Sequence, residues 1–318
     1  MGGGGVSGRD VMTTGMIGMH GSVASNMACD NCDLLIAVGC RFSDRVALKP
    51  ETFAHQAKIV HIDIDRAEIN KNVQTDHHII GDAKQVLNLL LERLPQYEHK
   101  EWKDFVLSFP RETEYGESES VLTPKQVLSA IARKCPQDSI VATDVGQHQM
   151  WAIQHLHFDY PGQLLTSGGF GTMGFGLGAA IGAAVGTGER SVLVTGDGSF
   201  GMCLNELTTA VTYNVPVVIL LMNNGVLGMV RQWQTLFFNK HYSNTILDRK
   251  TDFVALARAF GADGEAVDTV AALDKAFEHA FSCDGPYVID CRIDKDEFVL
   301  PMLPPGGSMD DIIMKVGE

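Results

Sequence analysis

Two apolar runs within residues 190–224 constrain the fold of this chain more than any other feature. SVLVTGD and PVVILLMNN are nearly continuous in Val, Ile and Leu, and a segment of helical length separates them. Such runs are typical of parallel strands buried on both faces, because the connecting helices cover both sides of the sheet. Further runs of this kind, SIVATDV, QLLTSG and PYVIDCRID, predict a doubly wound α/β domain over residues 123–295.

The first third of the chain shows the same pattern on a smaller scale. DLLIAVG, KIVHIDID and HHIIGD predict short strands, and AKQVLNLLLERL predicts a helix. The fold class is therefore α/β, with two doubly wound parallel-sheet domains. The charged, proline-bounded stretch between them predicts an interdomain linker. The predicted domains are 1–94, a linker over 95–122, a second domain over 123–295, and a tail over 296–318 that turns at Pro304–Gly307.

The composition excludes several classes of function. The formal net charge is −14, whereas nucleic-acid or anionic-membrane binding requires a basic face. No apolar run reaches the roughly 20 residues of a transmembrane helix. The seven cysteines are scattered, which suits a reducing compartment better than a disulfide framework. We expect a cytoplasmic protein that binds neither nucleic acid nor membranes.

Polar or glycine-rich residues follow four of the predicted strands. Asp144-Val145-Gly146, Ser167-Gly168-Gly169, Gly196-Asp197-Gly198 and Asn223-Asn224 all stand at strand exits. In doubly wound sheets, ligands bind at the carboxyl ends of the strands. A carboxylate and an amide oxygen there suit Mg²⁺, and nearby glycines let backbone N–H groups approach a phosphate. A lone Gly-Asp-Gly is more often a simple turn, but the spacing to Asn223-Asn224 favours a diphosphate held through Mg²⁺.

This Gly-Asp-Gly followed by Asn-Asn resembles the signature of thiamine-diphosphate enzymes. The stretches TDVGQHQMWA, TSGGFGTMGFG and GMVRQWQTLFF, with the terminal PPG, are similar to the catalytic large subunit of acetolactate synthase, also called acetohydroxyacid synthase. The resemblance extends over nearly all of 13–318. It implies a transferase that decarboxylates pyruvate and adds the two-carbon unit to a second 2-oxo acid, in branched-chain amino acid biosynthesis. Two alternatives are a pyruvate oxidase-like enzyme with thiamine diphosphate and FAD, and a non-catalytic cofactor-binding or assembly module.

The resemblance assigns roles to residues of the second domain. Asp197, Asn224 and the carbonyl of Val226 would hold the metal. Met173 would support the cofactor from below, and Met229 and Trp233 would shape the pocket of the second substrate; a core position on a helix is the alternative for each of these three. The residues that would line the diphosphate pocket are Val145, Gly146, Gln147, His148, Gly171, Gly198 and Ser199.

The first domain resembles the FAD-binding middle domain of the same family, through GMIGMHGSVASN, GCRFSDRV and VHIDID. In this family the FAD takes no part in redox turnover. The domain is curtailed relative to the family pattern, so FAD is a weaker expectation than thiamine diphosphate and Mg²⁺. The residues implied for FAD are Gly18, Met19, His20, Gly21, Arg41, Phe42, Asp44, Arg45, Asp63 and Asp82.

The family also has a pyrimidine-binding domain with an activating glutamate, and no part of this chain resembles it. We expect weak or no activity from the chain alone. We also expect a homo-oligomer, which a regulatory subunit or a partner chain that supplies the pyrimidine-binding domain can join. Gly178 stands where the family usually has Pro, which predicts a looser helix. Structural roles are expected for the remaining candidate ligands, namely Cys29, Cys32, His77, His78, His155 and His157.

Overall fold

The computed structural model describes residues 4–111, 121–247 and 250–316, and the chain forms two compact units. Unit 1 consists of Met1–Thr13 and Glu114–Val299, and unit 2 consists of Thr14–Thr113 and Leu300–Glu318. The chain therefore passes from one unit to the other at three points. This partition differs from the predicted boundaries, since the first residues belong with the second predicted domain and the tail belongs with the first.

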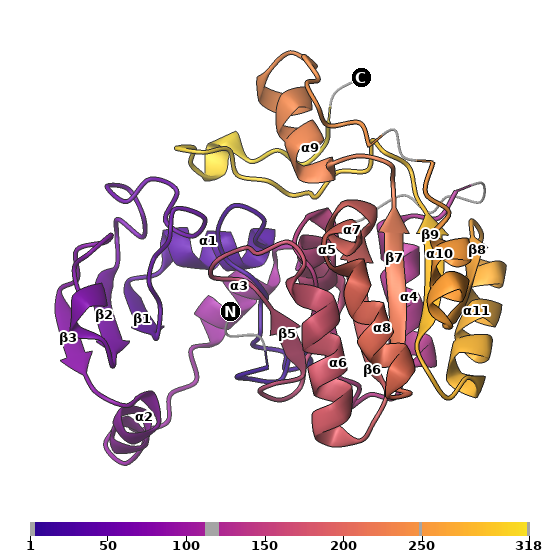
Figure 1. Cartoon of the computed structure of the whole chain (residues 1–318). Coiled ribbons are helices and arrows are strands. Elements are labelled where there is room, and N and C mark those ends of the chain that lie inside the picture. The colour runs from indigo at the N-terminus through magenta and orange to yellow at the C-terminus, as the bar shows by residue number, and fades with distance from the viewer. Residues whose placement is uncertain (1–3, 112–120, 248–249, 317–318) are drawn as a thin grey trace. The chain divides into compact units, whose positions relative to one another are not determined.

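Unit 1 is built on a six-stranded parallel sheet with the strand order β5-β4-β6-β7-β9-β8. Helices connect most consecutive strands (Figure 1). The predicted α/β class with parallel sheets is thus confirmed. In chain order the elements are α4 (Pro124–Lys134), β4 (Val141–Thr143), α5 (Gln147–His155), β5 (Leu164–Thr166), α6 (Phe175–Thr187), β6 (Ser191–Gly196), α7 (Asp197–Cys203), η2 (Leu204–Glu206), α8 (Leu207–Thr212), β7 (Val217–Asn223), α9 (Gly228–Phe237), α10 (Phe253–Phe260), β8 (Asp263–Val267), α11 (Val270–Ser282) and β9 (Tyr287–Arg292).

Helices cover both faces of this sheet. On one face α4, α5 and α11 pack against alternate strand residues such as Val218 and Leu220. On the other face α6, α8 and α10 pack against Ile219 and Leu221. Six consecutive residues of β6 and six of β7 are buried as a result. Burial on both faces explains why the two strands are continuous apolar runs rather than alternating ones.

Unit 2 contains a three-stranded parallel sheet with the order β1-β2-β3. Its apolar core is smaller and includes Phe42, Ala47 and Ile59. The tail 300–318 belongs to this unit, and Met302 pairs with Ile313 across a turn at the predicted position, Pro304–Gly307. The elements of unit 2 are α1 (Val23–Asn31), β1 (Leu34–Val38), β2 (Lys58–Asp63), η1 (Arg66–Glu68), β3 (His77–Ile80), α2 (Ala83–Leu91), α3 (Lys100–Leu107) and η3 (Met309–Asp311).

The stretch predicted as a linker holds the helix α3. Val106 is buried, and the rings of Trp102, Phe105 and Phe109 contact one another in succession at centroid distances of 5.5 and 5.1 Å. The carbonyl of Pro110 accepts a hydrogen bond from the Ala24 N–H of α1 at 3.2 Å. The linker interpretation followed the high charge of this stretch, whereas its aromatic residues provide an apolar face; the part of the prediction that covers 112–120 lies outside the described residues.

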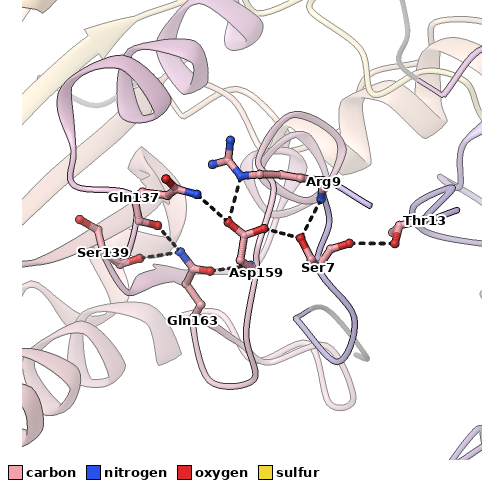
Figure 2. Close-up of polar contacts among 7 residues, drawn as sticks. All are labelled: Ser7, Arg9, Thr13, Gln137, Ser139, Asp159 and Gln163. Carbon is pink, nitrogen blue, oxygen red and sulfur yellow. Dashed lines mark hydrogen bonds and ion pairs between the residues drawn. The ribbon is translucent and has the colours of Figure 1, made fainter. Parts of the chain in front are cut away.

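The first residues of the chain are attached to unit 1 through Asp159, as Figure 2 shows. The Asp159 carboxylate accepts hydrogen bonds from the Ser7 hydroxyl at 2.6 Å, from Arg9 Nε at 2.9 Å and from Gln137 Nε2 at 3.1 Å. These donors lower the pKa of Asp159 to about 2. The Gly8 N–H also donates to the Phe158 carbonyl at 2.8 Å. These bonds explain why the opening segment belongs to the larger unit.

Within the described residues, no helix combines the length and apolar character that crossing a membrane requires.

Candidate cofactor- and metal-binding site

The two predicted metal ligands leave neighbouring strands of the six-stranded sheet. Asp197 directly follows β6, and Asn224 directly follows β7. These strands are parallel and paired, with Gly196 opposite Met222. Asp197 is only 4% exposed, and Asn224 is half-buried. The topology therefore brings the carboxylate and the amide to one edge of the sheet, as the sequence predicted.

The third predicted ligand, the Val226 carbonyl, lies in a compact turn after β7. The Val226 N–H donates to Asn224 Oδ1 at 3.1 Å, so the side-chain oxygen of Asn224 faces the same turn. The turn is held from outside, because the N–H of Leu227 donates to the Thr245 carbonyl at 2.8 Å and Val226 pairs with Ile246. Two of the three predicted oxygen ligands thus lie on one tightly bonded turn.

Next to this turn, a histidine ring lies against glycine backbone. A Cβ at Gly146 would lie 2.8 Å from His148 Cε1, and a Cβ at Gly196 would lie 2.9 Å from His148 Nδ1. Any larger residue at either position would displace the ring. His148 is 6% exposed, its Nε2 is buried without a hydrogen-bond partner among the described residues, and burial lowers its pKa to about 3. A buried, neutral imidazole with an unused nitrogen fits a polar ligand such as a diphosphate oxygen.

Asp144, at the end of β4, connects two of the predicted cofactor loops. Its Oδ1 accepts the N–H of Val145 at 2.9 Å and the N–H of Gly174 at 2.8 Å. The side chain is fully buried, and burial raises the pKa of its carboxyl, although the N–H donors act in the opposite direction. Asp144 therefore ties the loop that carries Met173 to the end of β4. The sequence placed Asp144 at a strand exit but not among the site residues.

The remaining predicted residues of unit 1 converge on the same edge. The Ser199 hydroxyl donates to the Val145 carbonyl at 2.8 Å, and a Cβ at Gly171 would lie 4.0 Å from the Val145 side chain. A Cβ at Gly198 would lie 3.1 Å from Leu227 Cδ2 and 3.7 Å from Met173 Cε. The sequence did not predict the proximity of Leu227 to Gly198. Residues from four strand exits are thus assembled into one cradle.

Met229 and Trp233 lie on α9, which begins directly beyond the turn that follows β7 (Figure 1). Met229 is half-buried and packs against the core beneath it. Trp233 is half-buried and makes an edge-to-face contact with Phe237 at 5.4 Å. Neither residue is fully committed to the core, so both retain surface for a ligand.

In unit 2, the predicted FAD residues form two groups. The first surrounds Gly18, where a Cβ would lie 2.2 Å from the Arg45 carbonyl, and the Met19 N–H donates to the same carbonyl at 2.9 Å. Gly21 closes this turn by donating its N–H to the Gly18 carbonyl at 2.9 Å. His20 is buried, and burial together with the charge of Arg45 lowers its pKa to about 4.

The side chains of the neighbouring loop diverge. Phe42 is 4% exposed and makes edge-to-face contacts with Phe53 and His61 at 5.7 and 5.1 Å, so it belongs to the core of unit 2. Arg41 and Asp44 are exposed, and Asp44 lies 3.4 Å from Arg45. The Phe42 side chain therefore does not face a ligand, whereas the exposed side chains of Arg41 and Asp44 remain accessible to one.

The second group lies at the carboxyl ends of β2 and β3. Asp63 is the last residue of β2 and pairs with Ile80 of β3. Asp82 comes two residues after Ile80, at the same end of the sheet. Both carboxylates have local partners: Asp63 accepts the N–H of Asp65 at 2.8 Å, and Asp82 caps α2 by accepting the N–H of Gln85 at 3.0 Å. The structure brings these two residues together, but part of their acceptor capacity is already used.

The donor set in unit 1 fits Mg²⁺ and a diphosphate. It offers one carboxylate, one amide oxygen and one backbone carbonyl, which leaves coordination positions for phosphate oxygens and water. The glycine backbone and the unused Nε2 of His148 lie beside it. No group of three or more His, Cys, Asp or Glu residues in the described part of the chain is arranged to hold a metal. A site of this kind would therefore depend on the ligand for several of its oxygens.

Comparison with known proteins identifies the class that this fold and site define. Residues 144–291 match the C-terminal TPP binding domain of thiamine pyrophosphate enzymes, and residues 1–90 match the central domain of the same enzymes. Together the two matches cover well over half of the chain, so the chain belongs to the thiamine pyrophosphate enzymes. Thiamine pyrophosphate is another name for thiamine diphosphate, the cofactor that the sequence predicted.

Within that class, the chain is similar over most of its length to large subunits of acetolactate synthase. It is 43% identical over 305 residues to the acetolactate synthase isozyme 2 large subunit of Escherichia coli, which covers 95% of this chain and 55% of that protein. It is 42% identical over 318 residues to the probable acetolactate synthase large subunit of Methanocaldococcus jannaschii, covering 96% and 54%. The Corynebacterium glutamicum large subunit is 42% identical over 320 residues, covering 95% and 51%. The chain spans about half the length of these relatives.

Proposed function

We propose that this chain provides the metal- and diphosphate-binding part of an acetolactate synthase-type carboligase. The observation that carries the proposal is the exit of Asp197 and Asn224 from paired strands beside the buried imidazole of His148. The membership of the chain in the thiamine pyrophosphate enzymes supports thiamine diphosphate as the ligand. The similarity to acetolactate synthase large subunits supports the reaction class.

Each group of residues has a distinct task in this proposal. Bound thiamine diphosphate supplies the carbon centre on which pyruvate is decarboxylated and from which its two-carbon unit passes to a second 2-oxo acid. Asp197, Asn224 and the Val226 carbonyl would hold Mg²⁺, and the Gly146 backbone and His148 Nε2 would contact the diphosphate. Met173, whose Cε lies 3.7 Å from the Cβ position of Gly198, supports the cofactor with an adaptable apolar side chain.

Selection of the second 2-oxo acid is assigned to α9. Met229 and Trp233 are half-buried on this helix, which follows the metal-binding turn directly. An aromatic and a thioether side chain at the mouth of the site would contact the alkyl part of the acceptor substrate. In the branched-chain amino acid pathway that substrate is pyruvate or 2-oxobutanoate.

Unit 2 is assigned to FAD. Gly18–Gly21 and Arg45 form one contact region, and Asp63 with Asp82 forms another at the ends of paired strands. Because both carboxylates already accept backbone N–H groups, we expect this binding to be weaker than that of thiamine diphosphate. Titration of the protein with FAD, followed by flavin fluorescence, would measure it.

The proposed active site also requires a domain from another polypeptide chain. The family resemblance implies that a pyrimidine-binding domain completes the active site. We propose that this chain forms a cytoplasmic homo-oligomer to which a different partner chain contributes that domain, and which can also bind a regulatory subunit. Addition of a chain that carries such a domain should then raise acetolactate formation by this protein.

The central test is the metal dependence of cofactor binding. Isothermal titration of the 318-residue chain with thiamine diphosphate should give binding in Mg²⁺ and a loss of at least about tenfold in affinity with EDTA. Asp197→Asn should reproduce that loss in Mg²⁺. Asp138→Asn is the matched control, because Asp138 is exposed and lies before β4, at the opposite edge of the sheet. Binding that is indifferent to both EDTA and Asp197→Asn would refute the proposed site.

A further inference from the structure

Three carboxamide side chains form a row at the carboxyl edge of the six-stranded sheet. Gln232 on α9 accepts a hydrogen bond from Gln147 Nε2 at 3.1 Å, and Gln147 Oε1 accepts one from Asn224 Nδ2 at 3.4 Å. Gln232 is 0% exposed and Gln147 is 4% exposed. The row connects the interior of α9 with a predicted metal ligand, and Gln232 itself is not among the predicted site residues.

The backbone of Val299 determines which way the Gln232 amide points. The Val299 N–H donates to Gln232 Oε1 at 2.8 Å, and Gln232 Nε2 donates to the Val299 carbonyl at 3.0 Å. A backbone N–H can only donate and a carbonyl can only accept. Rotating the Gln232 amide by half a turn would therefore oppose donor to donor and acceptor to acceptor. Its oxygen is held in one position, and this oxygen is the atom that faces Gln147.

The fixed orientation of the Gln232 amide determines the orientation of the Gln147 amide. Because the facing atom of Gln232 is an acceptor, Gln147 must present its NH₂ group. The same NH₂ group donates to the carbonyl of Glu297 at 2.9 Å, a second acceptor of fixed polarity. The oxygen of Gln147 is consequently turned away from both, towards Asn224. A Cβ at Gly228 would lie 1.8 Å from this oxygen, so the close fit also depends on glycine there.

The orientation of the Gln147 amide in turn determines that of the Asn224 amide. An acceptor oxygen on Gln147 requires the NH₂ group of Asn224 to face it, which turns Asn224 Oδ1 to the other side. The Val226 N–H, a fixed donor, meets Oδ1 on that side at 3.1 Å. Two independent constraints thus place the amide oxygen at the Val226 N–H, in the same turn as the predicted carbonyl ligand of Val226. A cation requires oxygen there, because an amide NH₂ group would repel it.

We propose that Gln232 is a positioning residue which, through Gln147, fixes the amide of Asn224 with its oxygen towards the metal. The inference rests on the proposed function, because it assigns the orientation of a metal ligand in that site. Gln232 contacts neither metal nor cofactor in this proposal. The Val299 peptide fixes the orientation of Gln232, and Gln232 thereby fixes the orientation of Gln147 and Asn224.

The chain contains a matched control for this role at the amino end of β5. Gln163 makes the same two-way pairing with the backbone: its Nε2 donates to the Gln137 carbonyl at 2.7 Å, and its Oε1 accepts the Asp159 N–H at 2.7 Å. Gln163 is 3% exposed and directly precedes its strand, whereas the row lies at the carboxyl ends of the strands. Gln163→Met therefore removes similar buried bonds without disturbing the row.

The first measurement is the affinity for Mn²⁺, read by electron paramagnetic resonance in the presence of thiamine diphosphate. Gln232→Met should weaken Mn²⁺ binding by about tenfold or more, as loss of a partner that orients a metal ligand does elsewhere. Gln163→Met should leave the affinity unchanged. At this fully buried position the carboxyl of Gln232→Glu should be protonated, so its hydroxyl can donate to the Val299 carbonyl while its other oxygen accepts from the Val299 N–H and Gln147. It should therefore restore most of the affinity. Thermal melting of all three variants establishes that they are folded.

A double-variant cycle separates orientation from general packing. Asp in place of Asn224 has two equivalent oxygens, so its carboxylate needs no orientation. In the Asn224→Asp background, Gln232→Met should therefore have little effect on Mn²⁺ affinity, since Gln147 is then free to turn its NH₂ group to the carboxylate. An equal loss in both backgrounds would show that Gln232 acts only through packing and would overturn the proposal.

The outcomes distinguish this inference from the proposed function. If the wild-type chain binds Mn²⁺ with thiamine diphosphate and Gln232→Met binds equally well, the positioning role is wrong and the proposed function stands. If the wild-type chain binds no Mn²⁺ under these conditions, the proposed metal site and the positioning role fail together. Hydrogen exchange of the Gln147 side-chain amide, followed by NMR, adds a readout without metal: it should be slow in the wild type and in Gln163→Met, and faster in Gln232→Met.

Discussion

The two parallel sheets of this chain arise from similar sequence patterns but are packed very differently. In the larger sheet, β6 and β7 are buried along nearly their whole length between two layers of helices. In the smaller sheet, β3 is exposed throughout, and Leu34, Ile36 and Val38 of β1 are 50, 46 and 38% exposed. The comparison shows that an apolar run predicts a strand more reliably than it predicts how completely that strand is covered.

The difference also bears on where a ligand can be held firmly. The predicted metal ligands Asp197 and Asn224 of unit 1 directly follow strands that are covered on both faces, and the Asn224 side chain is hydrogen-bonded to Gln147 and to the Val226 N–H. In unit 2 the predicted FAD residues Asp63 and Asp82 lie at the ends of strands in a sheet with one open face, and both carboxylates already accept local backbone N–H groups. We therefore expect precise metal and diphosphate binding in unit 1 and looser ligand contacts in unit 2.

The largest expected effect is a contrast in core stability between the two sheets. Leu220→Ala, at a fully buried position of β7, should lower the free energy of unfolding by about 3 kcal/mol. Ile36→Ala on β1, where the side chain is 46% exposed, should cost less than about 1 kcal/mol. Urea denaturation, combined with hydrogen exchange of peptides from β7 and β1, would measure both. Equal costs would remove the contrast.

The next prediction concerns the fit of α6 against the larger sheet. A Cβ at Gly176 would lie 2.9 Å from the backbone nitrogen of Asp144 and 2.7 Å from Leu193 Cδ1. Gly176→Ala should therefore force α6 away from β4 and cost about 1–3 kcal/mol. It should also disturb Asp144, which holds the loop carrying Met173. If Gly176→Ala and the wild type had the same melting temperature, the tight fit would be contradicted.

Acid should weaken both units through one buried histidine in each. Burial lowers the pKa of His148 to about 3 and, with Arg45, that of His20 to about 4, against an ordinary value of 6.5. The folded state keeps these rings neutral while the unfolded chain protonates them, so stability is complete above pH 6.5 and falls as the pH drops towards these lowered values.

Replacing either histidine with glutamine should reduce this acid sensitivity. Between about pH 7 and pH 5, His20→Gln and His148→Gln should each lose on the order of 1 kcal/mol less stability than the wild type. Urea midpoints at the two pH values give the comparison. If a variant and the wild type lose stability in parallel, the corresponding histidine is not neutral in the folded chain.

The smallest expected effect is a gain. Gly178 lies two residues from Gly176 on α6, but it is exposed, and no described atom lies within 4 Å of the position that an added Cβ would take. Gly178→Ala should therefore stabilise α6 by a few tenths up to about 1 kcal/mol, because alanine restricts the unfolded chain and favours helix. Measured beside Gly176→Ala, it shows that the sign of the change depends on the face of the helix.

Much of the larger unit could be predicted from the sequence because its strands are buried on both faces. The continuous runs that became β6 and β7 are unambiguous, and the polar residues that follow them identified the site edge. The strand β8 was missed because Asp263, Gly264 and Glu265 interrupt any apolar pattern; it lies at the edge of the sheet, where only part of a strand is buried. Short-range pattern carries little information about an edge strand of this kind.

Other features depend on contacts between distant parts of the chain. Gln232 attracts no attention in GMVRQWQ, since its role depends on Val299 and Gln147. Asp144 was seen as a strand exit, but its bond to Gly174 requires the fold. The partition of the units was missed for the same reason, because the attachment of Ser7 and Arg9 joins residues about 150 positions apart. A charge or an amide in the sequence does not reveal its partner.

The attachment of the opening segment to Asp159 has a practical consequence for anyone who dissects this protein. A recombinant fragment that begins at residue 123 would leave the Asp159 carboxylate without Ser7 and Arg9, two of its donors. Since unit 2 likewise draws on 300–318, neither unit can be excised by a single cut in the gene. A faithful minimal version of unit 1 would need the first 13 residues fused to its start by a designed connection.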